Sequence, residues 1–305
     1  MKILHGFRAA AVFSLCLLPL GCDLVQPFAG SAEEDFALNT SFADVGSLSI
    51  KWVNGNIKVR INPTATELTA TGTKKIEASD DAAAAARLEE FKVTLSVAES
   101  FPLQVFLVAD FPEGSPVTVA EADLEVVIPS GVNLNIESTN GRVEIVGNEG
   151  TSEVGLVNGE IIILEQAGNV LASTVNGRVK VNSESGGVEA DVTNGLIEID
   201  ASPAAPESIV ANTVNGNVTV SIPNTAGANV DLSTVIGGIN HSFGDFATID
   251  LRIVDLASVT AVLNGGGATV QAGAVTGFVN FAGQNSAVLP DDPVNPQELD
   301  DQQAL

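Results

Sequence analysis

The residues best suited to acid–base chemistry are four glutamates in the middle of the chain. They are spread through a region where polar and apolar residues alternate, and they are Glu144, Glu160, Glu189 and Glu198. Hydrolysis of a glycosidic bond needs two carboxyl groups placed on either side of that bond. The alternation instead places each glutamate on the solvent side of a strand, where columns of charge are expected. We therefore predict no catalytic residue and expect the protein not to be an enzyme.

Histidine chemistry and metal binding have little support in the residue pattern. His5 belongs to the N-terminal apolar segment, so His241 is the one remaining histidine. It follows a column of apolar residues, a place where a capping role is typical. Acidic pairs occur without the spacing of a calcium loop, at Asp80-Asp81, Asp291-Asp292 and Asp300-Asp301. We expect no metal site and no cofactor.

Cysteine is confined to the N-terminal end, where Cys16 and Cys22 are the two cysteines of the chain. The basic residues Lys2 and Arg8 precede the apolar stretch Ala9–Leu20. This stretch is too short to span a bilayer as a helix and is typical of a signal peptide. The rest of the chain therefore contains no disulfide framework and no thiolate metal site.

The signal peptide ends in Leu18–Cys22 (LPLGC), which resembles a bacterial lipobox. Pro19 departs from that pattern, which prefers leucine at this position. We predict a signal peptide over residues 1–21, acylation of Cys22 with chains such as palmitate, and a lipidated tether over residues 22–35. The alternative is ordinary cleavage after Ala32, at the end of the small-residue sequence Gly-Ser-Ala.

The composition is strongly acidic, which restricts the classes of partner. The chain has 38 Asp and Glu residues against 13 Lys and Arg residues, a formal net charge of −25. Nucleic acid is excluded, because phosphate binding needs a basic face. A basic surface that binds anionic lipid is excluded for the same reason. We expect contact with the membrane through the N-terminal lipid, and a glycan or an envelope protein as further partner.

An internal repeat organises the chain. It is centred on Asn-Gly, whose asparagines are Asn54, Asn140, Asn158, Asn176, Asn194 and Asn215, and Ile236-Gly237 continues the series. From Asn140 onward the spacing is 18 residues three times and then 21. Apolar residues recur six and four positions before the asparagine and three and five positions after it. Each repeat therefore holds two short strands with one buried face each, joined at a corner that needs positive φ.

The repeat predicts an all-β fold, a single-stranded parallel β-helix or solenoid with coils of 18–21 residues. Antiparallel hairpins would also use Asn-Gly but would not repeat the same inward columns in every unit. Opposite charges such as Glu160 and Arg178 would be neighbours in successive coils, and the asparagines would form a ladder of amides. A left-handed acyltransferase helix is excluded, because its aliphatic residue recurs at every sixth position.

The pattern is interrupted between the first coil and residue 132. One short helix is predicted after Asp80, in the alanine-rich run up to Phe91. Strands are predicted at Lys92–Ala98, Leu103–Ala109 and Leu124–Ile128. The expected organisation is a solenoid domain over residues 36–285 with regular coils over 132–241, a late coil aligned on Thr276-Gly277, and a disordered acidic tail over 286–305.

The coil Ser173–Val181 (STVNGRVKV) resembles the repeats of the bacterial "putative adhesin" families. These include a domain of unknown function with Val-Ser-Gly-Asp-Val coils and its relative, the head GIN domain. Gly238-Ile239-Asn240 matches the motif of that relative, and Val126–Val132 resembles the usual approach to the repeats. The resemblance covers Phe36 to Gly283. It implies a β-solenoid on an exported or membrane-tethered protein and implies no established activity.

These observations favour a non-enzymatic lipoprotein of the bacterial cell envelope that presents a stiff solenoid for binding or structure. A periplasmic scaffold or a component of an envelope-stress sensor is the alternative. A β-helical carbohydrate-active enzyme is a third hypothesis. Trp52, two positions before Asn54, is interpreted as packing across an open end of the stack, with an exposed ligand platform as the alternative.

Overall fold

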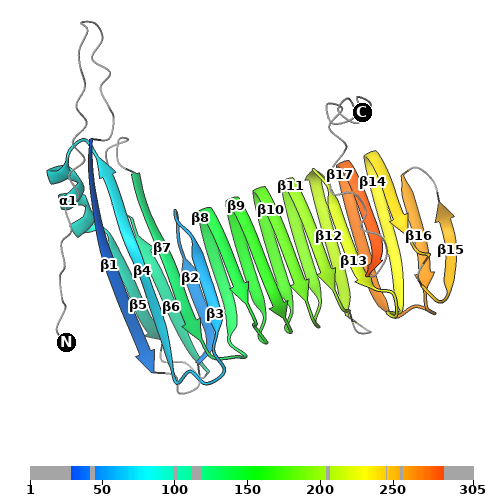
Figure 1. Ribbon diagram of the computed structural model, residues 1–305, viewed down its shortest axis with the longest axis horizontal. Coiled ribbons are helices and arrows are strands. Elements are labelled where there is room, and N and C mark those ends of the chain that lie inside the picture. The colour runs from blue at the N-terminus through cyan, green and yellow to red at the C-terminus, as the bar shows by residue number, and fades with distance from the viewer. Residues whose placement is uncertain are drawn as a thin grey trace, which may run out of the picture. The chain divides into compact units, whose positions relative to one another are not determined.

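The computed structural model describes residues 29–41, 45–98, 102–111, 119–203, 207–244, 246–254 and 257–284. The chain divides into two compact units, Met1–Glu144 (unit 1) and Ile145–Leu305 (unit 2). Their described parts contain seventeen strands and one short helix, so the protein is all-β (Figure 1). The predicted signal peptide, Cys22 and the predicted acidic tail lie outside the described residues. Within the described ranges, no helix has the length and apolar character needed to cross a membrane.

Unit 1 contains a mixed sheet. In chain order its elements are β1 (Gly30–Ser41), β2 (Val45–Lys51), β3 (Ile57–Ile61), β4 (Glu67–Ala78), α1 (Asp81–Glu90), β5 (Lys92–Ala98), β6 (Leu103–Asp110), β7 (Val119–Ile128) and the first part of β8 (Asn133–Val146). β4 pairs antiparallel with β1 and β7, and β5 pairs antiparallel with β6. β2 pairs in parallel with β6 and β8, and β3 with β7. The three strands predicted in this region are present as β5, β6 and part of β7.

Strand β1 begins at Gly30, so the tether predicted over residues 22–35 is wrong for its last six residues. Charge explains why this acidic segment is a strand. The register places Glu33 opposite Lys75 and Glu34 opposite Lys74 on β4. Opposite charges on directly facing residues stabilise a strand pair by about 0.2–1 kcal/mol each. Glu34 pairs with Lys74, whereas Lys75 pairs with Glu77 and Glu121.

The predicted helix is confirmed as α1. The Asp80 carboxylate accepts a hydrogen bond from the Ala83 backbone N–H at 2.8 Å, which caps the helix. Beside it, the buried Lys74 donates from Nζ to the Phe91 carbonyl oxygen at 3.0 Å and pairs with Glu34 at 2.8 Å. Lys74 thus links β1, β4 and the end of α1.

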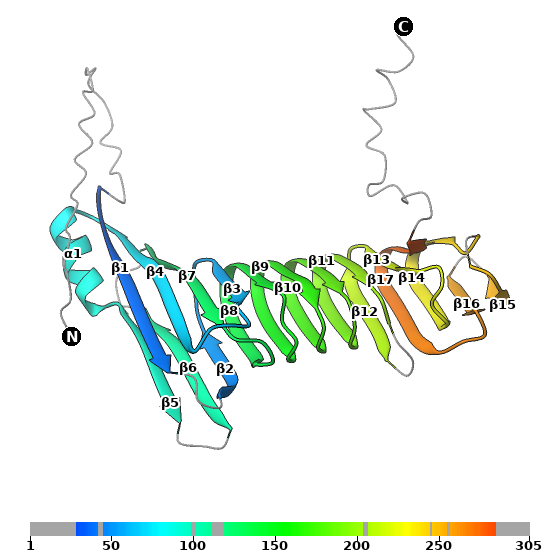
Figure 2. The same ribbon diagram turned by 60° about the horizontal axis from the view of Figure 1, so that its bottom comes forward.

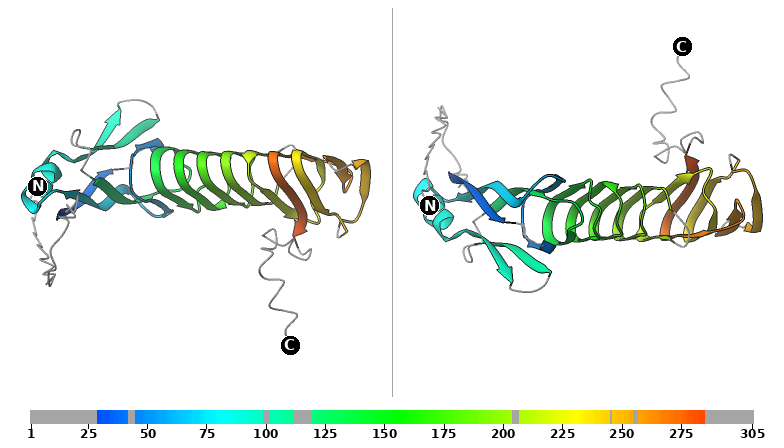
Figure 3. Two further views of the ribbon diagram at one scale, coloured as in Figure 1. Left: turned by 90° about the horizontal axis from the view of Figure 1, so that it is seen from above. Right: turned by 90° about the horizontal axis from the view of Figure 1, so that it is seen from below.

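Unit 2 contains strands that stack in the register the repeat predicts. They are β9 (Ser152–Gln166), β10 (Val170–Ser183), β11 (Val188–Ala201), β12 (Ser208–Asn215), β13 (Val218–Pro223), β14 (Ala228–Ser242), β15 (Ile249–Val254), β16 (Ser258–Leu263) and β17 (Ala268–Gln284). β10 pairs in parallel with β9 and β11, with residues opposite their equivalents one repeat away, except that the register with β9 shifts between Val181 and Ser183. Figure 3 shows these strands lying one behind another with their bends aligned. The apolar columns of the repeat are buried, including Val179, Val181, Ile197 and Ile199.

The expectation of a purely parallel stack is not met. At the far end of unit 2, β16 pairs antiparallel with the first part of β14, and β15 pairs antiparallel with β16. This antiparallel pair covers one half of the terminal coil edge (Figure 2). Covering an exposed strand edge limits its pairing with other chains.

The order of the last coils differs from their order in the sequence. Strand β17 lies between β12–β13 on one side and β14 on the other, parallel to both (Figure 1). Thr276 is the partner of Asn215, and Ile236 is the partner of Thr276. The coil at Ile236-Gly237 therefore does not stack on the Asn215 coil, and the regular series predicted over 132–241 ends at β13.

Asn264 fixes the crossing that leads into the inserted strand. Its side-chain amide donates to the carbonyl oxygens of Asn224 at 2.8 Å and Ala226 at 3.0 Å. Asn264 and the glycines Gly265–Gly267 that follow all have positive φ, which permits the tight reversal into β17. These contacts tie the entry of β17 to the loop that precedes β14.

We expect Phe281→Ala on β17 to lower the free energy of unfolding by about 3–5 kcal/mol. The Phe281 ring is fully buried, with its centroid 5.4 Å from that of Phe243 and 6.3 Å from that of Phe246. Phe278→Ala is the matched control, because Phe278 lies on the same strand and is 42% exposed. It should cost less than about 1 kcal/mol. Denaturant titration measures both, and equal losses would contradict the inserted register of β17.

Candidate binding face of unit 2

The asparagine corners of the repeat form hydrogen-bonded ladders. In unit 2 the side-chain amide of each asparagine donates to the side-chain oxygen of the previous one, at 2.9 Å for Asn176 to Asn158, 3.0 Å for Asn194 to Asn176 and 2.9 Å for Asn215 to Asn194. In unit 1, Asn140 donates to Asn54 at 2.6 Å. Because these amides bond to one another, the ladder serves to hold the corners in register.

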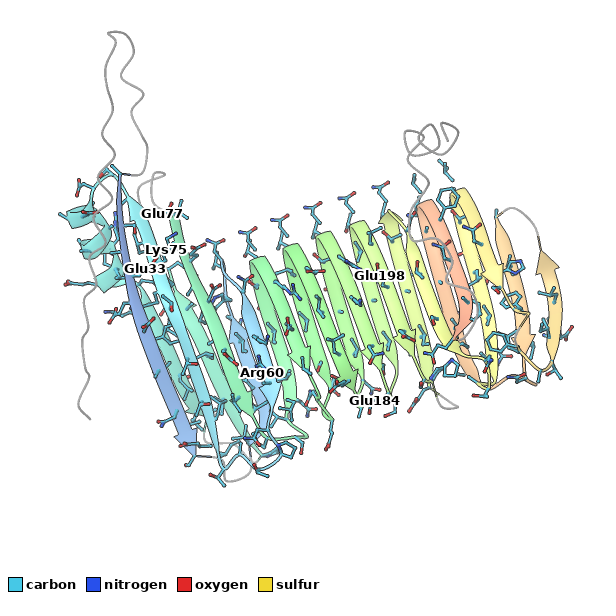
Figure 4. All side chains as sticks on the ribbon, in the orientation of Figure 1. Glu33, Arg60, Lys75, Glu77, Glu184 and Glu198 are labelled. Atoms are coloured by element: carbon cyan, nitrogen blue, oxygen red, sulfur yellow. The ribbon has the colours of Figure 1, made fainter. Side chains whose placement is uncertain are left out.

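The strand that follows each corner carries paired charges. Arg178 lies between Glu160, at 3.8 Å, and Glu198, to which it donates a hydrogen bond. Figure 4 shows Glu198 on this part of β11. Glu160 and Arg178 are neighbours in successive coils, as predicted. Glu198 forms its ion pair with Arg178 and not with Lys180, which is its partner in the strand register.

The same region of the repeat in unit 1 also holds paired charges. The Glu144 carboxylate lies 2.9 Å from the Lys58 ammonium and 3.2 Å from the Arg142 guanidinium. The hydrogen bond from Lys58 lowers the pKa of Glu144 below its ordinary value. A general acid in glycoside cleavage needs a raised pKa, which is the opposite direction.

The strand that precedes each corner in unit 2 presents a different surface, which we call the trough face. It consists of the outward side chains five, three and one positions before the corner in β9–β12, β14 and β17. Its outermost column is Val157, Val175, Thr193, Val214, Val275 and Val235 in stacking order. Each of these valines is at least 42% exposed. The valines therefore form an apolar stripe along the stack, interrupted in one coil by Thr193.

A shallow groove of about 360 Å³ runs beside the valine stripe. Ser173, Asp191 and Asn212 occupy three successive coils of the next column and line it. Asn212 donates to the Asp191 carboxylate at 3.3 Å. Thr174 and Thr213 stand two positions before their corners and are buried on the inward side of the strand, where within the described structure their hydroxyls have no hydrogen-bond partner. These hydroxyls therefore belong to the interior of the stack and not to the trough face.

Except for Glu189, the other residues that the sequence singled out lie outside the trough face or form contacts within the protein. Trp52 is 4% exposed and donates its indole N–H to the Ala122 carbonyl oxygen at 2.7 Å, so the exposed platform is excluded. The His241 ring stacks on Phe243 at 4.6 Å between centroids. Of the four glutamates, Glu189 alone belongs to the trough face. In the described ranges, no three His, Cys, Asp or Glu side chains lie close enough to hold a metal ion.

Sequence reasoning did not identify the trough face, although one feature pointed to it. The position directly before each corner is valine in most coils, and alternation places that position outward. Exposed apolar residues that repeat in one column are unusual on a soluble surface.

Comparison with known proteins adds little to this geometry. The chain matches no protein-family model and no curated protein. A "putative cell adhesion protein" from Clostridium sporogenes is 12% identical, with a TM-score of 0.36 over 83% of this chain and 100% of its own. A "putative adhesin" from Bacteroides fragilis is 12% identical, with a TM-score of 0.34 over 84% of this chain and 98% of its own. Another putative adhesin, from Parabacteroides distasonis, is 14% identical, with a TM-score of 0.22 over 83% of this chain and 98% of its own. Likenesses this distant carry no argument about function.

Proposed function

We propose that this chain is a non-enzymatic, adhesin-like binding module of the bacterial cell envelope, anchored by lipid on Cys22. The coils of unit 2 form a β-solenoid that presents the trough face to a partner. The trough face carries this proposal, because it combines a stripe of exposed valines with a groove lined by polar side chains of three successive coils. Solenoids bind through such extended faces.

The place where β1 begins supports processing at Cys22. Cleavage after Ala32 would remove Gly30, Ser31 and Ala32, which pair with Ala78, Glu77 and Ile76 of β4. Cleavage before Cys22 keeps the whole strand and leaves residues 23–29 as the tether. A tether this short holds unit 1 close to the membrane surface, since an extended chain covers about 3.3–3.6 Å per residue.

The pairing of the glutamates supports a binding rather than a catalytic role. Glu160 and Glu198 flank Arg178, and Glu144 is held ionised by Lys58. An acid–base pair for glycoside cleavage would require one carboxyl group that stays protonated near neutral pH.

The anchor is tested by labelling cells with a palmitate analogue and comparing Cys22→Ser with Cys16→Ser. We expect Cys22→Ser to abolish labelling and membrane retention, and Cys16→Ser to leave both unchanged, because Cys16 would be removed with the signal peptide. An N-terminus at Glu33 in mass spectrometry, or labelling that survives Cys22→Ser, would refute the anchor.

Protease treatment of intact cells distinguishes exposure on the cell surface from a location inside the envelope. Release of unit 2 peptides favours the adhesin-like role, and protection until the envelope is broken favours the periplasmic scaffold.

A further inference from the structure

The two strands of each coil in unit 2 differ in the charged residues that they carry. The strand after the corner carries Arg178 and Lys180 among its acidic residues. None of the outward positions of the trough face holds lysine or arginine, and four of them hold carboxylates: Glu153, Glu189, Asp191 and Asp231. All four are exposed. Within the described structure no ion pair involves any of them, whereas the two glutamates flanking Arg178 are both paired.

In the first four coils of the stack the carboxylates alternate with apolar residues. In the column five positions before the corner, the order is Glu153, Leu171, Glu189, Val210, Gln271 and Asp231. Successive coils lie about 4.8 Å apart, so Glu153 and Glu189 are about 10 Å apart with Leu171 between them. The valine stripe runs parallel to this column on the other side of the groove. Over the first four coils, carboxylates and apolar side chains therefore lie next to one another on this face.

We propose that the trough face binds a cationic polypeptide segment in which Lys or Arg residues are interspersed with apolar residues. This inference rests on the proposed function of the trough face as a binding surface. The ammonium or guanidinium groups of this segment would pair with the carboxylates of Glu153, Glu189, Asp191 and Asp231. The apolar side chains of the segment would cover Leu171 and the valine stripe, and its polar backbone groups would reach Ser173 and Asn212 in the groove.

The charge pattern favours this ligand over a glycan. A neutral glycan could donate hydrogen bonds to these carboxylates but would leave their charge unneutralised, and an anionic polysaccharide is repelled by them and by the net charge of −25. The apolar component of the face is aliphatic, because none of its outward positions holds an aromatic residue on which a sugar ring could stack. Aliphatic side chains of a polypeptide pack well against such a stripe.

The test measures the affinity of the purified full-length lipoprotein in detergent for a fluorescent peptide that alternates lysine and valine. A glutamate–valine peptide, a lysine–serine peptide and a cello-oligosaccharide are the comparison probes. We expect the lysine–valine peptide to bind most tightly, with an affinity that falls as salt is added. Glu189→Gln combined with Asp191→Asn should weaken binding about two- to thirtyfold. Val175→Thr combined with Val214→Thr should weaken it as well, and Thr193 shows that threonine fits this column.

Glu165→Gln combined with Glu184→Gln is the charge-matched control, since both are exposed and lie outside the trough face. It should leave the affinity unchanged. The proposal of a cationic ligand is wrong if the glutamate–valine peptide binds as tightly as the lysine–valine peptide. It is also wrong if the control pair of substitutions weakens binding as much as Glu189→Gln combined with Asp191→Asn. If the cello-oligosaccharide is the one probe that binds, and Asp191→Asn weakens its binding, the trough face is a binding surface but its ligand is not a cationic polypeptide. If no probe binds with an affinity that the trough-face variants change, the proposal that the trough face is a binding surface is wrong.

Discussion

A Val179→Asp chain is expected not to form the native stack of unit 2. Val179 is fully buried in β10, with Ile161 and Ile197 as its register partners in the coils on either side. The substitution removes a buried apolar side chain and leaves an unpaired carboxylate in its place. Together these changes cost about 5–8 kcal/mol, which is comparable to the total stability of about 5–15 kcal/mol that is typical of folded proteins.

Lys180→Asp is the matched control for this substitution. Lys180 is the next residue along β10 and is exposed, so its replacement changes the charge without changing the core. The new carboxylate lies beside Glu198 in the register, which should cost less than about 1 kcal/mol. Circular dichroism and denaturant titration of the two chains measure the difference. Similar unfolding midpoints would show that the inward column does not pass through residue 179.

Gly177→Ala is expected to prevent the corners of β9 and β10 from stacking. Gly177 has a φ of 154°, and an added Cβ would lie 1.7 Å from the Gly159 carbonyl oxygen. The backbone strain alone costs about 1–3 kcal/mol. Relief of the contact would require the coils to separate, which would break the asparagine ladder between Asn158 and Asn176.

Gly155→Ala is the control, because Gly155 lies in the same stack and its added Cβ would meet only the Ser173 hydroxyl, at 3.9 Å. We expect that variant to unfold at the same temperature as the unmodified chain. Thermal unfolding followed by circular dichroism distinguishes the two. A Gly177→Ala chain that melts like the Gly155→Ala chain would show that the corners do not approach one another as closely as the structure has them.

The order of the final coils illustrates why one part of the fold could not be read from the sequence. Six and four positions before the corner, β12 carries Ile209 and Ala211, β17 carries Val270 and Ala272, and β14 carries Val230 and Leu232. Any two of these strands could stack with the same inward columns. The choice depends on Asn264 and the glycine turn after it, which tie the start of β17 to the loop before β14.

Unit 1 shows a second limit of the same kind. The residues around Glu34 belong to the predicted tether, and their pairing with β4, which includes the ion pair between Glu34 and Lys74, makes them part of a strand. The trough face is a third case. Single valines such as Val175 are ordinary surface residues, and they become a stripe only when successive coils bring them into one column.

The sequence by itself determined the period of the coils, their inward columns, the asparagine corners and the capped helix α1. Each of these depends on residues close together in the chain, where alternation, positive φ and a capping carboxylate act locally. The tertiary structure decided the insertion of β17, the pairing of β1 with β4 and the assembly of the trough face. These depend on contacts between segments distant in sequence, and such contacts are chosen by shape and charge after the local elements have formed.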